Sequence, residues 1–276
     1  MSWIRWLSTI TRRKSDKDII MKKVFLSFDF EEFDLPKEHG VDIPLEEQIR
    51  VSAEGAERLL NILQEEQVHA TFFVTGVFAS HVPQILLRLV KEGHEIASHS
   101  MRHSEMQPAD LADSKQLLER LTSKKVFGYR QPRMMPISGQ QLYNAGYQYN
   151  ASLNPTWIPG RYNHLRKPRT PFMKDNVLQI PASVTPWLRF PLFWLSNHVL
   201  PQWLYLLLVR RTLCHDGFFT TYMHPWEFYP LNEHPEWKVP RYISACCGVA
   251  MKERLRHLIQ MLKREDASFY TLNSTL

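Results

Sequence analysis

Strand-like apolar runs and amphipathic helices alternate along this chain from Val24 to the C-terminus. Residues 24–28 form a continuous apolar run of strand length, typical of a parallel strand that is covered on both faces. Residues 45–67 carry apolar side chains at helical spacing. Further strands are predicted at 69–74, 95–98, 125–129, 147–149, 177–180, 218–223 and 268–271, and further helices at 83–90, 111–121, 138–145 and 251–262. No linker-like stretch interrupts this order. It predicts one α/β domain with a parallel sheet, and the number of units favours a (β/α) barrel over an open sheet.

The net charge of the 276 residues is mildly positive, at +6. Basic side chains cluster only at 12–14 and 161–169, which suits an anionic glycan, a lipid phosphate or a membrane surface. No nucleic-acid-binding motif accompanies them, so we expect no nucleic acid partner. Cys214, Cys246 and Cys247 make a poor disulfide framework, because their number is odd and two of them are adjacent. We therefore expect a reducing, cytoplasmic location.

Two segments raise the question of membrane contact. Residues 1–20 are predicted to be an extension before a domain at 21–276, either disordered or a basic, tryptophan-bearing helix on a membrane surface. Residues 190–209 contain no charged side chain and approach the length of a membrane span, but prolines and polar residues interrupt the middle. We expect a barrel helix and an aromatic-rich loop there. Peripheral contact with the inner face of the membrane, through 190–209 or 1–10, is the alternative.

Polar side chains recur at the ends of the predicted strands. Asp29 and Glu31 end the first strand, His99 and His103 follow the third, Arg130 follows the strand at 125–129, and His224 follows the strand at 218–223. In a (β/α) barrel these positions share one rim, at the carboxyl ends of the strands, where active sites are built. Residues far apart in sequence are therefore predicted to meet around one centre.

The residue types at this rim suit a metal-dependent hydrolase. His99 and His103 are four residues apart, so their rings reach one face if the chain turns helically after Ser98. Two imidazoles and a carboxylate from 28–32 would leave open positions on a cation, and this donor set favours Zn²⁺. Such an ion polarises a carbonyl and lowers the pKa of bound water.

The remaining rim residues suit proton transfer. Asp29 is positioned to take a proton from water, and Arg130 is expected to keep Asp29 ionised and oriented through a charge-assisted hydrogen bond. His224 is positioned to protonate a leaving amine. Together these residues favour hydrolysis of an amide or an ester.

From Met21 onward the chain resembles the polysaccharide deacetylase family, the NodB-homology domains of carbohydrate esterase family 4. The resemblance rests on residues 27–31 (SFDFE), 99–103 (the pattern H-[ST]-x-x-H), 130–132 (RQP) and 223–224 (MH), with ATFFV at 70–74 as further support. It implies a distorted, seven-stranded (β/α) barrel. It also implies that Asp29 is the base, Arg130 orients this base and His224 is the acid.

The resemblance further implies that Glu31, His99 and His103 bind the metal, with Glu32 as the alternative carboxylate. Two departures from the family pattern stand out. Phe30 separates two acids that are adjacent in the commonest first motif, and the usual aspartate that pairs with the acid histidine is missing, with only Asn150 nearby. The partner of His224 is therefore left open.

Two aromatic residues, Trp226 and Tyr149, are predicted to contact the substrate, since aromatic rings pack under sugar rings. The predicted function is metal-dependent removal of the N-acetyl group from an amino sugar of a polysaccharide or glycan precursor. One alternative is deacylation of a lipid-linked sugar at the cytoplasmic membrane face. Another is a catalytically weak glycan-binding module.

Overall fold

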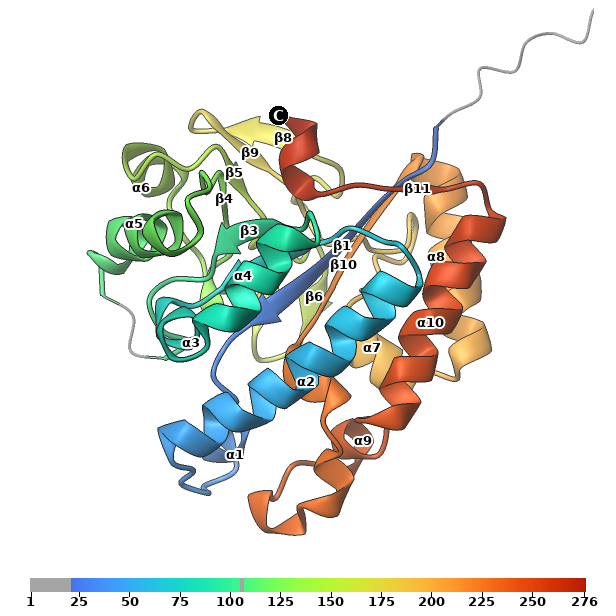
Figure 1. The fold of residues 1–276 in the computed structure, drawn as a ribbon. Coiled ribbons are helices and arrows are strands. Elements are labelled where there is room, and N and C mark those ends of the chain that lie inside the picture. Colours follow the sequence, from blue (N-terminus) through green and yellow to red (C-terminus); the bar gives the residue numbers. More distant parts are fainter. Residues whose placement is uncertain (1–20, 105–106) are drawn as a thin grey trace, which may run out of the picture.

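A computed structural model describes residues 21–104 and 107–276, so the predicted extension at 1–20 lies outside the described residues. The fold is organised around a curved, nine-stranded sheet (Figure 1). Seven of its strands run parallel in the order β10 (Phe218–Met223), β1 (Lys23–Phe30), β2 (Thr71–Val74), β3 (Glu95–Ser98), β4 (Gly128–Tyr129), β5 (Tyr149–Asn150) and β9 (Val177–Gln179). β1 lies between β10 and β2 and is buried over almost its whole length, which explains why most of its side chains are apolar.

The predicted distorted (β/α) barrel is confirmed, and two short strands add to the seven consecutive parallel ones. β8 (Phe172–Lys174) extends the sheet antiparallel to β9, and β11 (Ser268–Phe269) pairs parallel with β1. The chain beyond β9 reaches back to β10, where the Ser183 N–H donates to the Thr220 carbonyl at 2.9 Å. A loop rather than a further strand therefore bridges the last side of the barrel.

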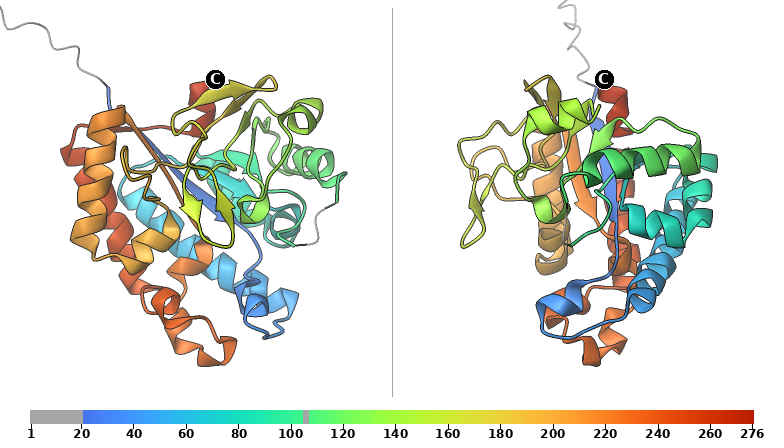
Figure 2. Two further views of the ribbon diagram at one scale, coloured as in Figure 1. Left: turned by 180° about the vertical axis from the view of Figure 1, so that it is seen from behind. Right: turned by 90° about the vertical axis from the view of Figure 1, so that its left-hand side faces the viewer.

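Helices surround the sheet (Figures 1 and 2). They are α1 (Leu35–Glu38), α2 (Leu45–Glu65), α3 (Gly76–His81), α4 (Pro83–Lys91), α5 (Asp110–Thr122), α6 (Gly139–Asn144), α7 (Trp194–Val199), α8 (Gln202–Asp216), α9 (Arg241–Ser244) and α10 (Val249–Arg264). The short α1 and α9 lie beyond the carboxyl ends of the strands. α2 buries the stripe that its spacing predicts, including Ile49, Leu59 and Leu63. α8 ends at Gly217, whose φ of 72° lets the chain reverse into β10 without the strain that a side chain would bring.

Two apolar clusters occupy the two sides of the sheet. The larger lies between the strands and the outer helices. The smaller contains Phe25, Phe73, Ala97 and Tyr149 and lies on the opposite face of the same strands. The inner face of the barrel is therefore packed, as expected for a small barrel, and the functional groups are confined to one end.

Residues 190–209 form parts of two helices instead of one. Trp194 begins α7, whereas Phe190 and Phe193 precede it outside any helix, and α8 begins only after Pro201. Proline fixes φ and favours the first turn of a helix, which explains the break. In the part of the chain that the structure describes, no helix combines the length and the apolar character needed to cross a membrane.

Candidate metal centre and active site

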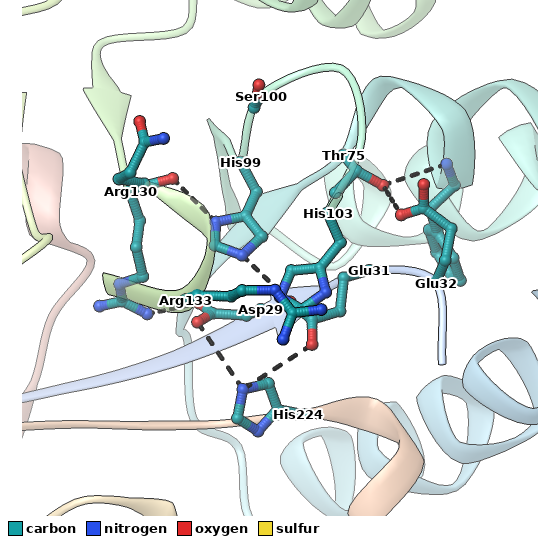
Figure 3. Close-up of polar contacts among 12 residues, drawn as sticks. Asp29, Glu31, Glu32, Thr75, His99, Ser100, His103, Arg130, Arg133 and His224 are labelled. Carbon is teal, nitrogen blue, oxygen red and sulfur yellow. Dashed lines mark hydrogen bonds and ion pairs between the residues drawn. The ribbon is translucent and has the colours of Figure 1, made fainter. Parts of the chain in front are cut away.

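The carboxyl ends of the strands bring the predicted rim residues together (Figure 3). Glu31 follows β1 directly, His99 follows β3, and His224 follows β10. All three side chains are buried or nearly so. The pairing of β1 with β10 and β2, and of β2 with β3, fixes these ends beside one another.

Glu31, His99 and His103 form a compact group of donors. The Glu31 Oε2 lies 3.1 Å from the His99 Nε2 and 3.2 Å from the His103 Nε2. The three ligand atoms all lie within 4.8 Å of one another. A carboxylate oxygen and two imidazole nitrogens at this separation fit a divalent cation such as Zn²⁺.

The two imidazoles reach this position by a route that differs from the predicted helical turn. Ser100 adopts a left-handed φ of 69°, and its carbonyl accepts a hydrogen bond from the Gly76 N–H at 3.0 Å. This bend turns the chain back after β3, so that the rings of His99 and His103 lie 5.9 Å apart and nearly parallel.

Each histidine is fixed by a hydrogen bond on the nitrogen that faces away from Glu31. The His99 Nδ1 donates to the Arg130 carbonyl at 2.8 Å, and the His103 Nδ1 donates to the Asp34 Oδ1 at 2.9 Å. Such partners fix the ring orientation of metal-binding histidines and leave Nε2 for the ion. Asp34 was missed by the sequence analysis, although it lies only three residues after Glu31.

Burial by itself lowers the pKa of His103, but Glu31 and Asp34 outweigh it and raise this pKa to about 9. The pKa of Glu31 is lowered: burial opposes ionisation, but the neighbouring His103, His224 and His99 outweigh it. Proton and cation therefore compete for the same buried group of donors.

Glu32, the alternative carboxylate, points away from the two histidines. Its Oε2 accepts a hydrogen bond from the Thr75 hydroxyl at 2.7 Å (Figure 3). The carboxylate within reach of His99 and His103 is that of Glu31.

Asp29 and Arg130 form a buried ion pair beside this group, as the sequence predicts. The Arg130 Nη1 donates to the Asp29 Oδ1 at 2.5 Å, and its Nη2 and Nε donate to Ser27 and Ala151. The guanidinium also lies 4.0 Å from the centre of the Phe73 ring. With its donors engaged and its plane packed, Arg130 holds Asp29 in one orientation.

His224 faces the same centre from the opposite side. Its Nε2 lies 4.0 Å from the Asp29 Oδ2 and 3.9 Å from the Glu31 Oε1. The ring of Trp226 stacks against His224, with centroids 4.8 Å apart and an interplanar angle of 14°.

The partner of His224 is Glu227, a residue that the sequence analysis did not consider. The Glu227 Oε1 accepts from the His224 Nδ1 at 2.9 Å and from its backbone N–H at 2.6 Å. The Glu227 Oε2 lies 2.8 Å from the Nε2 of His198, whose Nδ1 donates to the Ile243 carbonyl. A buried chain, His198–Glu227–His224, therefore supplies the carboxylate that Asn150 cannot.

A glycine lets the backbone after His224 pack against α2. A Cβ on Gly55 would stand 2.0 Å from the Pro225 carbonyl oxygen, far inside contact distance. Only glycine allows α2 to approach this turn so closely. The 3₁₀ turn Pro225–Phe228, which carries Glu227, is thereby braced by the helix.

The two predicted substrate contacts have different positions. Trp226 lines the pocket above the donor group, together with Tyr162, Trp194 and Tyr242. Tyr149 is fully buried on the inner face of the barrel, and its hydroxyl donates to the Glu95 Oε1 at 2.9 Å. Because Glu95 begins β3, Tyr149 points toward the amino ends of the strands and does not line the pocket. A substrate contact by Tyr149 does not fit this position.

Fold and geometry together define a (β/α) barrel with a candidate metal centre, an oriented carboxylate and a buried histidine at one rim. Residues 21–145 match the model of the polysaccharide deacetylase family. The resemblance deduced from the motifs is therefore confirmed over this part of the chain, which includes Asp29, Glu31, His99, His103 and Arg130.

Known proteins agree with this assignment. A chitooligosaccharide deacetylase of Bradyrhizobium sp. (strain ANU 289) is 35% identical over 81 residues, which are 28% of this chain and 35% of that protein. The chain thus matches about a third of the length of this relative. Two solved structures share the fold at 16% identity, each with a TM-score of 0.63. They are the PuuE allantoinase (93% of this chain, 90% of that chain) and a probable polysaccharide deacetylase from Pseudomonas aeruginosa PAO1 (92% and 88%).

Proposed function

We propose that the protein is a metal-dependent deacetylase that removes the N-acetyl group from an amino sugar of a glycan. The observation that carries this proposal is the meeting of Glu31, His99 and His103 beside Asp29 and His224. The family match over residues 21–145 and the similarity to the Bradyrhizobium chitooligosaccharide deacetylase support it.

Glu31, His99 and His103 are the proposed ligands, and Zn²⁺ is the proposed ion. The donor atoms fit because both histidines offer Nε2 and both Nδ1 atoms are already hydrogen-bonded. A divalent cation bound there would supply Lewis acidity toward an amide carbonyl and toward water.

Asp29 is the proposed general base. Its Oδ1 is held by Arg130, which leaves its Oδ2 directed toward the centre of the site. Held in this orientation, the Asp29 carboxylate is the group placed to accept a proton from the attacking water.

His224 is the proposed general acid, which gives a proton from Nε2 to the departing sugar amine. Burial opposes the charged ring, but Glu31, Glu227 and Asp29 outweigh this effect and raise the pKa of His224. Glu227 fixes which nitrogen faces the substrate, and His198 in turn fixes Glu227.

The missing family aspartate was the support for a catalytically weak binding module. Glu227 supplies a buried carboxylate to the His224 Nδ1, so that alternative loses its support.

The pocket suits a sugar rather than an apolar amide. Aromatic side chains form part of its wall, and Arg133 and Arg161 contribute cationic groups. Aromatic faces and charged hydrogen-bond donors together are typical of carbohydrate sites, where ring faces stack and hydroxyl groups are hydrogen-bonded. A polysaccharide, a chitooligosaccharide and a lipid-linked amino sugar all meet this description.

Acetate release tests the proposal. We expect the full chain, loaded with Zn²⁺, to release acetate from N-acetylated chitooligosaccharides, and the Asp29→Asn variant to lose roughly 10²–10⁴-fold in kcat while it keeps its metal. The control is Asp42→Asn, which changes an acid that does not line the pocket. Absence of acetate from chitooligosaccharide, peptidoglycan and lipid-linked amino-sugar substrates, with metal bound, would refute a deacetylase.

A further inference from the structure

The positive charge of the chain is concentrated in one segment. Residues 155–216 contain eight Lys and Arg residues but only two acids, Asp175 and Asp216. The segment therefore carries a net charge of +6, equal to that of the whole chain, so the remaining residues sum to zero. Concentrated charge of one sign indicates a surface that attracts the opposite sign.

The same segment exposes unusually large apolar side chains. Trp157, Trp187 and Trp203 are 57%, 87% and 69% exposed, and Leu188 is 87% exposed. The other three tryptophans in the described part of the chain are buried or partly buried. Exposed tryptophan beside cations is typical of surfaces that enter the interface of a bilayer, where the ring is half in water and half in lipid.

Contacts join the parts of this segment into one surface. The Arg189 Nη1 donates to the Lys167 carbonyl at 2.7 Å, which ties the turn at 186–189 to the basic stretch 161–169. The ring of Trp187 lies edge-on to His215 near the end of α8, with centroids 6.2 Å apart.

α8 continues the same surface. Trp203, Leu207 and Arg211 follow each other at intervals of four residues and lie on the side of the helix opposite its buried residues Tyr205, Val209, Thr212 and Leu213. Two residues on this face, Trp203 and Arg211, are exposed. In Figure 2, left, α8 and the hairpin of β6 (Trp157–Ile158) and β7 (Tyr162–Asn163) share the side of the molecule that faces the viewer.

We propose that this surface, which we call the basic face and define by Trp157, Lys167, Trp187, Leu188, Trp203 and Arg211, binds an anionic lipid bilayer. Net charge favours an anionic partner, and the exposed tryptophans favour a bilayer over a soluble polyanion. The basic face extends the membrane contact predicted at 190–209 to residues on both sides of that range.

The basic face continues into the active-site pocket. Arg161 and Tyr162, from the β6–β7 hairpin, and Trp194 of α7 line the pocket. A protein seated on a bilayer through the basic face would thus present the pocket beside the lipid headgroups. An amino sugar linked to a membrane lipid is the substrate class that fits, a step that rests on the proposed function.

Vesicle flotation tests the binding independently of turnover. We expect the full chain to float with vesicles of phosphatidylcholine and phosphatidylglycerol (3:1), to float about tenfold less with pure phosphatidylcholine, and to be released by high salt. The double variant Trp187→Ser/Leu188→Ser should lose about tenfold in vesicle binding, and Lys167→Glu/Arg211→Glu should lose a similar amount.

Leu87→Ser is the matched control, because Leu87 is 58% exposed on α4, outside residues 155–216. It should bind vesicles as the unaltered chain does, and thermal melts should show that all variants are folded. Equal binding by the Trp187/Leu188 variant and the unaltered chain would overturn the proposal. So would binding to an acidic polysaccharide or to RNA without binding to vesicles. Acetate release without vesicle binding would leave the proposed function intact and reject the basic face.

Discussion

The two halves of the active site are built in different ways. Glu31 and His99 follow the ends of β1 and β3, which lie on either side of β2, and His103 follows the bend after β3. All three lie within the part of the chain that matches the family model. His224 lies outside the matched part, and its support comes from a 3₁₀ turn and from α7.

The two halves therefore depend on different parts of the fold. In the cation-binding half, strand register places Glu31 and His99, and the bend at Ser100 places His103. The acid half is fixed by the buried chain from His198 through Glu227 to His224, with links of 2.8 and 2.9 Å. Its geometry therefore depends on how α7 packs against the turn at 225–228.

The largest effect is expected from a substitution in the cation-binding half. His99→Ala removes one of the three proposed ligands, so we expect loss of the proposed Zn²⁺ and a fall of roughly 10³-fold or more in kcat. Metal content by elemental analysis and acetate release measure the two effects. His257→Ala, an exposed histidine on α10, is the control. Full activity of metal-free His99→Ala would show that turnover does not need a cation-binding half.

A smaller effect is expected from the acid half. Glu227→Gln should keep its metal but lose about 10–100-fold in kcat, because His224 loses the carboxylate that orients it. Loss of this carboxylate also lowers the pKa of His224. Since the protonated ring is the acid, the fall of activity at alkaline pH should move to lower pH.

Profiles of kcat against pH for the unaltered chain, Glu227→Gln and Glu227→Asp would measure this shift. Partial recovery is expected in Glu227→Asp, which restores the charge on a shorter side chain. An unchanged profile in Glu227→Gln would show that Glu227 has a structural role alone.

The smallest effect concerns proton release on metal binding. With the pKa of His103 raised to about 9, this ring is protonated at pH 7 and must lose its proton to a cation. Below pH 9, we expect the apparent affinity for Zn²⁺ to fall about tenfold for each pH unit, with about one proton released. Titration calorimetry in buffers of different ionisation enthalpy measures this release. The Asp34→Asn variant should release less, and metal binding without proton uptake by the buffer would contradict the expectation.

Sequence reasoning predicted the barrel and six site residues because both follow from periodic patterns. Strand ends can be read from apolar runs, and polar residues at those ends converge in any parallel barrel. It missed Asp34, Glu227 and His198. Asp34 and Glu227 each orient a histidine ring, and His198 fixes Glu227, but only the packing of the folded chain brings these residues to their partners. Tyr149 was assigned to the wrong place for a related reason. A Cβ on Gly128 would stand 1.9 Å from the Tyr149 ring, so this ring occupies space on the inner face of the barrel that glycine leaves open.

The close approach of Gly55 to Pro225 has a consequence for how the acid half can move. The turn that bears Glu227 rests on the backbone of α2 and cannot retreat in that direction. The backbone of α2 therefore blocks a displacement of His224 toward this helix during turnover. Gly55 has a hydrogen atom where alanine would have a methyl group, and this lets the backbone of α2 support the turn next to His224.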